Sequence, residues 1–234
     1  MNAEILSAST ASPRDTGIQK SLIKINIGCG PNHSLPGFVN IDNSPSIYLS
    51  RVPWMKRLLR RFGLLTDQQV KDDWSGVVKA DASRRLPFGD ETVDKIYSSH
   101  FLEHIPYAKG LHVLKECRRV LLKGGTMRLV VPDLLWHAER YVSQTRKLLS
   151  EGTEPNDRRF HDEFLESVYG AYLNKRRYGA MHCYMYDFPT LVNILQSLGF
   201  SRVQTYPFQK GGDAELAALD SRPEDSLHVE VVRT

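Results

Sequence analysis

The sequence predicts an α/β fold built on a mostly parallel sheet. Short segments rich in β-branched residues alternate with segments of helical periodicity, and two final strands suit a closing antiparallel hairpin. Strands that alternate with helices are typical of a parallel sheet whose faces the helices cover. The chain of 234 residues is long enough for one such domain, and no apolar run approaches the length of a membrane span.

The expected strands are short, apolar and bounded by glycine, proline or aspartate. They cover residues 22–27, 38–41, 76–80, 93–98, 126–131, 202–208 and 227–232. A helix is expected over 108–122, where apolar residues follow helical spacing and KGG closes the last turn. A later helix should begin after Asp187, a favoured N-cap residue, and end at Gly199.

The composition narrows the class of protein. Apolar residues make up 41% and charged residues 25%, as in ordinary soluble domains. Residues 1–20 lack the basic start and long apolar run of a signal peptide, so we expect a flexible leader before a single domain over 21–234. The three cysteines stand far apart, which favours neither disulfides nor a zinc site and fits the cytoplasm. A net charge of +4 permits anionic partners without requiring them.

A glycine loop, GCG, follows the first expected strand. A dinucleotide site needs G-x-G-x-x-G, a helix, and an acidic residue about 20 positions on. Here His33 holds the third-glycine position, Asp42 comes only twelve positions after Gly30, and Pro36 interrupts any helix between. A pyrophosphate, which binds a helix N-terminus, is therefore disfavoured, whereas a ligand with a ribose and no phosphate fits. The alternative is a tight turn without a ligand.

Two aspartates end the next two expected strands. Asp42 could accept hydrogen bonds from ribose hydroxyls, and Asp81 could accept one from the exocyclic amine of adenine. Both would lie at the carboxyl edge of the sheet, where open α/β sheets bind ligands. Either aspartate alone could be a cap or turn residue. The fourth strand ends at the same edge with YSSHFLEHI, where a serine could cap a short helix and His100 or His104 could do chemistry or pack.

Four segments together resemble class I S-adenosylmethionine-dependent methyltransferases: KINIGCG, VNID, DASRRLPFGDETVDKIYSSHFLEHI and VLKECRRVLLKGGTMRLVVPD. The resemblance covers about residues 22–133 and is closest to a small bacterial branch, similar to methyltransferase type 11. It implies a Rossmann-like sheet of seven strands in order 3-2-1-4-5-7-6 with strand 7 antiparallel. This chain departs from that pattern by a first crossover cut to a loop and by a helical insertion over 44–75.

The resemblance implies a site for S-adenosylmethionine, with S-adenosylhomocysteine as the product. It assigns the methionine part to Gly28, Cys29 and Gly30, and the ribose to Asp42 with Asn43 beside it. It places Asp81 and Ala82 at the adenine, and Ser99 and His100 near the transferable methyl.

The insertion contains a basic amphipathic segment. Apolar residues at 54, 58, 59, 62 and 65 can share one helical face, and arginines flank it. Such a helix can lie on a membrane surface or bind an acidic ligand. We favour a lid packed on the domain, and peripheral membrane contact through 51–65 is the alternative.

A second region, 134–186, is expected to form helices on the acceptor side. Its end, NKRRYGAMHCYMYD, is dense in aromatic and basic residues. Tyr178, Tyr184 and Tyr186 could line a pocket for a sugar or aromatic acceptor, or they could simply cover the last helix.

The implied reaction is direct displacement at a sulfonium methyl, so the protein mainly aligns the reactants. A hydroxyl acceptor also needs a base, for which His182 is preferred over His100 and His104. No metal is expected, because no convincing ligand spacing occurs and FHDEF at 160–164 is a weak candidate. We expect O-methylation of a small molecule or, by analogy, a glycan. The alternatives are a non-catalytic cofactor-binding module and a nucleic-acid methyltransferase, which is disfavoured because no nucleic-acid-binding module is recognisable.

Overall fold

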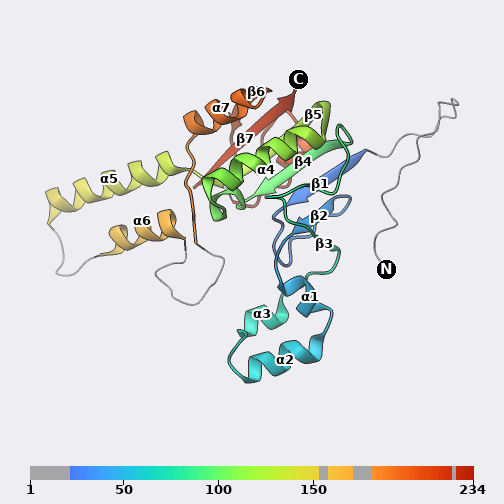
Figure 1. The fold of residues 1–234 in the computed structure, drawn as a ribbon. Helices are drawn as coiled ribbons and strands as arrows, with labels where there is room; N and C mark the ends of the chain where they lie inside the picture. The colour runs from blue at the N-terminus through green and yellow to red at the C-terminus, as the bar shows by residue number, and fades with distance from the viewer. Residues whose placement is uncertain (1–21, 153–157, 171–180, 223–224) are drawn as a thin grey trace, which may run out of the picture.

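The computed structural model describes residues 22–152, 158–170, 181–222 and 225–234, and it confirms the predicted fold (Figure 1). One sheet has the order β3-β2-β1-β4-β5-β7-β6, in which β7 is antiparallel to both neighbours and the other pairings are parallel. The strands are β1 Ile23–Ile27, β2 Val39–Asp42, β3 Val77–Lys79, β4 Val93–Ser99, β5 Leu121–Pro132, β6 Phe200–Tyr206 and β7 Ser226–Arg233. The expected leader, residues 1–20, lies outside the described residues.

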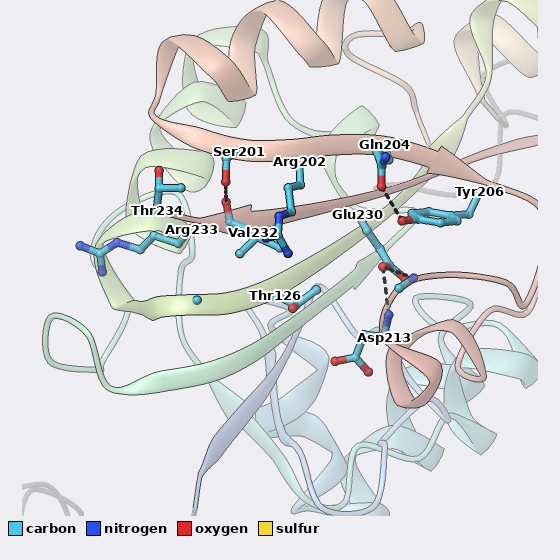
Figure 2. A pocket seen from close by; sticks show the side chains of 12 residues that line it. Thr126, Ser201, Arg202, Gln204, Tyr206, Asp213, Glu230, Val232, Arg233 and Thr234 are labelled. Carbon is cyan, nitrogen blue, oxygen red and sulfur yellow. Dashed lines mark hydrogen bonds between the residues drawn. The ribbon is translucent and has the colours of Figure 1, made fainter.

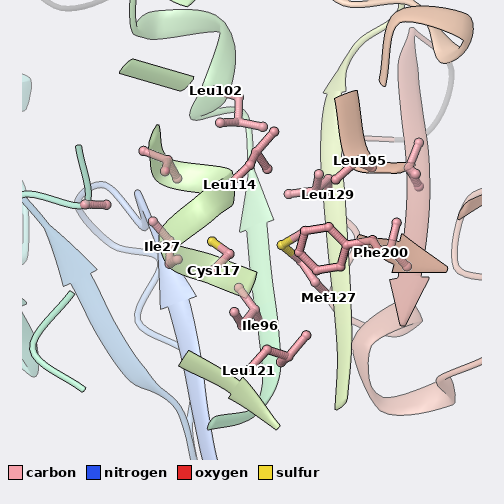
Figure 3. Close-up of a cluster of buried hydrophobic side chains, with 14 of the residues drawn as sticks. Ile27, Ile96, Leu102, Leu114, Cys117, Leu121, Met127, Leu129, Leu195 and Phe200 are labelled. Carbon is pink, nitrogen blue, oxygen red and sulfur yellow. The ribbon is translucent and has the colours of Figure 1, made fainter. Parts of the chain in front are cut away.

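Two helices cover one face of the sheet: α4, Tyr107–Val120, and α7, Phe188–Ser197. Their buried side chains share a single core with β1, β4 and β5, which includes Leu114, Ile96 and Met127 (Figure 3). As expected, Asp187 is the N-cap of α7, accepting from the backbone N–H of Thr190 at 2.8 Å. This helical layer holds the strands whose carboxyl ends carry the candidate site.

The junction of α4 and β5 differs from the expectation. The helix was expected to reach 122 and to end at KGG, with a strand from 126. Instead α4 ends at Val120 and β5 begins at once with Leu121. The KGG residues lie in an irregularity of β5, where the pairing with β4 passes from Val93↔Leu121 to Lys95↔Thr126. Gly124, with φ +80°, allows the backbone to bend there.

The other face of the sheet is covered by the connection between β6 and β7. The first crossover, residues 28–38, contains no helix. A short helix, α8 (Ala214–Ala217), lies on this face instead: its Leu216 packs with Tyr97 and Val130, and Leu219 packs against the same cluster. The sequence predicts only a polar linker here, so the helix was missed.

A buried ion cluster holds that connection in place. Arg128 of β5 is fully buried; its Nε and Nη2 donate to Asp220 at 2.8 and 2.6 Å, and its Nη1 donates to Glu230 at 2.5 Å. Glu230 in turn accepts from the backbone N–H groups of Gly212 and Asp213 at 2.8 and 3.2 Å. The guanidinium therefore joins β5, β7 and both ends of the β6–β7 connection.

Further helices extend away from the sheet (Figure 1). They are α1 Ser46–Ser50, α2 Pro53–Arg61, α3 Asp67–Lys71, α5 Leu134–Glu151 and α6 Arg159–Tyr169. A 3-10 turn, Leu102–His104, follows β4, and its Leu102 is buried in the main core. Within the described ranges, no helix combines the length and the apolar character needed to cross a membrane.

Arg128→Ala should lower the free energy of unfolding by about 3–5 kcal/mol, because it leaves two buried carboxylates without their cation. Urea denaturation followed by circular dichroism measures this. Lys147→Ala is the control: it removes a surface pair with Glu151 at 4.0 Å and should cost less than about 1 kcal/mol. Equal losses in the two variants would contradict the anchoring role of Arg128.

Candidate cofactor and acceptor site

The glycine loop after β1 is shaped by contact with the segment that follows β4. Gly28 has φ +70°, and a Cβ added there would lie 2.3 Å from Cγ of Phe101. Glycine is therefore required both for the backbone conformation and for space. Gly30 also has a positive φ, +65°, but a Cβ there would meet nothing within 4 Å. The Phe101 ring is therefore the group against which the backbone of the glycine loop packs at Gly28.

Asp42, the last residue of β2, joins the glycine loop to the insertion. Its Oδ2 accepts from the backbone N–H of Gly30 at 2.9 Å, and its Oδ1 accepts from that of Ser44 at 2.8 Å. A carboxylate offers about four lone-pair sites, so Asp42 can still accept from two further donors. Two neighbouring hydroxyls of a ribose are such a pair of donors.

Asp81 stands just after β3, on the neighbouring strand. Its Oδ1 accepts from the backbone N–H and the hydroxyl of Ser83 at 2.9 and 2.7 Å. These hydrogen bonds lower the pKa of Asp81, so the carboxylate is ionised at neutral pH. Its Oδ2 lies 3.5 Å from Nε of Arg84 and can accept from a further donor.

These two carboxylates open into one cavity of about 260 Å³, the β2–β3 cavity. Apolar walls from Ile41, Phe101 and Ile105 face it together with the two acids. Of the residues expected to bind the cofactor or act as base, it brings together Gly28, Asp42, Asn43, Asp81, Ala82 and His104.

A second cavity of about 310 Å³, the β4 cavity, lies on the other side of the glycine loop. It gathers three further predicted residues, Cys29, Ser99 and His100. Burial, and then the charge of Asp42, raises the pKa of Cys29 to about 12, so its thiol stays protonated and is a poor nucleophile. Leu219 and Arg222 of the β6–β7 connection complete the wall.

The residues at this edge fit a nucleoside cofactor without phosphates. The β2–β3 cavity supplies carboxylate acceptors and apolar walls, which suit the hydroxyls and the base of an adenosine. No helix begins at the glycine loop, so the N-terminal dipole that would bind a pyrophosphate is missing from the first crossover. The loop is the boundary between the two cavities: Gly28 lines one, and Cys29 lines the other.

A buried carboxylate, Glu103, lies beneath this edge. It is fully buried, and neither of its carboxylate oxygens accepts a hydrogen bond of good geometry within the described chain. Its Oε1 lies 3.2 Å from Nδ1 of His100 and 3.8 Å from Nε2 of His104. Burying a carboxylate is costly unless a polar partner compensates it, and these two imidazoles are the side chains that approach it.

Two histidines, His104 and His182, lie close to the Glu103 carboxylate. Nδ1 of His104 is 3.0 Å from the carbonyl oxygen of Met181, and Nδ1 of His182 is 2.7 Å from that of Ser167. Burial lowers the pKa of His182, which is therefore neutral at pH 7. With Glu103, these histidines offer ligand atoms within 4.8 Å of one another, so the three residues could also coordinate a metal ion.

His100 has a strained backbone and a position between two partners. Its φ is +50°, an uncommon value for a residue with a side chain. Nδ1 faces Glu103 at 3.2 Å, and Nε2 is 3.1 Å from Oγ of Ser226, the first residue of β7. A carboxylate, an imidazole and a hydroxyl in this order form the arrangement by which histidine bases act.

The three expected acceptor tyrosines have different positions. Tyr186 is buried in the main core and lines neither cavity. Tyr184 packs between Tyr107 and Tyr186, with ring centroids 4.8 and 5.0 Å away. Tyr178 lies outside the described residues. The burial of Tyr186 fits the interpretation that the tyrosines cover the last helix, and the acceptor role of the tyrosines stays a prediction.

Sequence reasoning missed the burial of Glu103 and the contact of Phe101 with Gly28. Both residues stand in the YSSHFLEHI segment, whose spacing reveals neither feature. Leu219, Arg222 and Ser226 reach the site only because the β6–β7 connection folds back. A separate hollow of about 560 Å³ over β5, β7 and β6 (Figure 2) contains none of the predicted site residues.

Gly28→Ala should destabilise the protein by about 2–5 kcal/mol, because it adds a collision with Phe101 to the cost of a positive φ. Gly30→Ala, which has the same backbone requirement and open space, should cost only about 1–2 kcal/mol. Thermal unfolding of both variants measures the difference. If Gly30→Ala were as damaging as Gly28→Ala, the contact with Phe101 would not explain the loop.

Residues 25–129 match the family model described as a methyltransferase domain. No curated protein matches the chain significantly. The fold is similar to a solved S-adenosylmethionine-dependent methyltransferase from Thermotoga maritima, described as a possible histamine N-methyltransferase, with 17% identity, a TM-score of 0.48, and coverage of 91% of this chain and 82% of that one.

Two further solved structures are similar to this chain. A methyltransferase from Mesorhizobium loti has 20% identity and a TM-score of 0.47, with 91% of each chain covered. One from Aquifex aeolicus has 16% identity and a TM-score of 0.47, with 93% of this chain and 85% of that chain covered. Residues 25–129 thus match a methyltransferase domain, and the sheet order with its antiparallel β7 is that of the Rossmann-like methyltransferase fold.

Proposed function

We propose that this protein is an S-adenosylmethionine-dependent methyltransferase that methylates a hydroxyl oxygen of a small molecule or glycan, with His100 as the general base. The observation that carries the proposal is the array of Glu103, His100 and the Ser226 hydroxyl beside the β4 cavity. In such an array the carboxylate orients the imidazole, whose far nitrogen takes a proton from a hydroxyl. The Ser226 hydroxyl marks where a hydroxyl can approach Nε2.

His100 is preferred here over His182, the residue that the sequence favours. His182 lines neither cavity, and its Nδ1 is held by the carbonyl oxygen of Ser167. His104 lines the β2–β3 cavity, away from the β4 cavity. We assign both residues to enclosing the Glu103 carboxylate. A negative charge on that carboxylate stabilises the imidazolium that His100 becomes when it takes a proton.

We propose that the cofactor spans the two cavities across the glycine loop. Asp42, with Asn43 beside it, would bind the ribose. Asp81 and Ala82 would border the adenine. Gly28, Cys29 and Gly30 would surround the methionine part, and Ser99 would join His100 near the methyl group. Support comes from the free lone pairs of Asp42 and from the apolar walls between the two aspartates.

In this reaction the protein aligns the acceptor with the cofactor and removes one proton. When bound, the cofactor supplies an activated methyl group that is transferred by direct displacement. The protein holds the acceptor oxygen in line with that methyl group, which can lower the barrier by several kcal/mol, on the order of 7–11 in the best-aligned systems. His100 removes the hydroxyl proton at Nε2, and Glu103 keeps Nδ1 facing away from the acceptor.

Asp42→Asn should weaken binding of S-adenosylmethionine by about 10–100-fold, because hydrogen bonds to a charged acceptor are lost. Isothermal titration calorimetry on the folded variant measures the Kd. Asp67→Asn, an exposed acid at the start of α3, is the matched control and should leave the Kd unchanged. Equal Kd values for Asp42→Asn and the unmodified protein would remove Asp42 from the ribose site.

His100→Asn should reduce kcat by about 100–10,000-fold while the Kd for S-adenosylmethionine stays nearly constant. Asparagine is chosen because it tolerates a positive φ. Turnover is followed as S-adenosylhomocysteine formed with a panel of sugars and phenols. Glu103→Gln should lower kcat without changing KM, as expected of a positioning residue, and His182→Ala should have the smaller effect.

The same turnover assay tests whether Glu103, His104 and His182 instead bind a metal ion that the reaction needs. We propose a metal-independent reaction, so dialysis against a chelator should leave kcat unchanged. Loss of turnover on chelation with recovery on adding Zn²⁺ would assign Glu103, His104 and His182 to a metal site. Full activity of His100→Asn would equally overturn its assignment as the base.

A further inference from the structure

The outer surface of α2 carries an apolar stripe that the rest of the described chain leaves exposed. Trp54, Leu58 and Phe62 recur every four residues, which places them on one side of the helix. Their exposed fractions are 64, 45 and 69%. The sequence favours a lid whose apolar face packs on the domain. In the structure that face points outward.

The stripe is bordered by cations. Arg57 and Arg61 follow the same side of α2, and a shallow hollow of about 640 Å³ is lined by Trp54, Leu58 and the three arginines at 57, 60 and 61. The sequence from 44 to 66 contains no acidic residue. The first acid beyond it, Asp67, pairs with Arg60, which leaves Arg57 and Arg61 to meet an external anion. We call Trp54, Arg57, Leu58, Arg61 and Phe62 the α2 stripe.

Contacts on the inner side keep the stripe facing outward. Lys56, on the opposite side of α2, is buried, and its Nζ donates to the backbone oxygens of Val70 and Asp72 at 3.3 and 2.9 Å. Ile47 of α1 is buried in a cluster with Trp74. These contacts tie α2 to α3 and to the end of the insertion. In Figure 1 the three helices project beyond the β3 edge of the sheet.

We propose that the α2 stripe docks this enzyme on the surface of a bilayer that contains anionic lipids. Tryptophan, phenylalanine and leucine on one side of a helix suit the boundary between headgroups and acyl chains, and flanking arginines suit lipid phosphates. The combination of side chains decides the partner, because a duplex nucleic acid would match the arginines but would leave the leucine and the two aromatic side chains without apolar partners. The proposal does not depend on the acceptor or on His100.

The test is flotation of the full chain with vesicles of phosphatidylcholine, alone or mixed with phosphatidylglycerol. The protein should float with the mixed vesicles, and raised salt should weaken the association. Arg57→Ala with Arg61→Ala should reduce partitioning by about thirtyfold, since each cation near an anionic surface contributes about 1 kcal/mol. Trp54→Ala with Phe62→Ala should reduce it by about tenfold or more.

The control variant changes two residues of α5, Arg146 and Leu149, which are also exposed. Arg146→Ala with Leu149→Ala should float like the unmodified protein. Circular dichroism melting of every variant separates loss of docking from loss of fold. Absence of flotation on mixed vesicles, unchanged flotation of both stripe variants, or a stripe-dependent shift of RNA without flotation would each overturn the proposal.

Discussion

The buried guanidinium of Arg128 is the interaction on which the architecture of the site depends. It lies on the face of β5 opposite the main helical layer and binds Asp220 and Glu230. The connection between β6 and β7 would otherwise be a long polar segment with little to hold it. Because both of its ends are tied to this cation, it folds back over the sheet. The close approach leaves no room for a side chain at Gly211, where a Cβ would lie 1.9 Å from Oε1 of Glu230.

That folded connection compensates for the missing first crossover helix. In a doubly wound sheet a helix normally covers each face beside the first strand. Here the glycine loop passes directly to β2, and Leu216 of α8 covers Tyr97 and Val130 instead. Lys95 of β4 supports α8 through ion pairs with Asp213 and Glu215 at 2.6 and 3.1 Å. The same connection also contributes Leu219 and Arg222 to the lining of the β4 cavity. One segment therefore both covers the sheet and forms a wall of the site.

The sequence predicts the sheet well because local patterns specify it. The β-branched strands, the Asp187 cap and the helix before β5 all follow from residue spacing, and Asp42 and Asp81 follow from the rule that ligands bind at carboxyl edges. What escapes prediction depends on contacts between distant segments. The burial of Glu103, the covering role of α8 and the burial of Tyr186 cannot be read from neighbouring residues. The outward position of the α2 face depends on such contacts too, because amphipathic periodicity shows that a face is apolar but not what covers it.

We propose that the cofactor crosses the glycine loop so that its reactive end meets His100. A crystal structure with S-adenosylhomocysteine tests this most directly. We expect the ribose hydroxyls on Asp42, the adenine between Asp81 and Phe101, and the sulfur facing the β4 cavity within reach of an acceptor held at Nε2 of His100. A sulfur directed toward His182, or a ribose that does not touch Asp42, would contradict it.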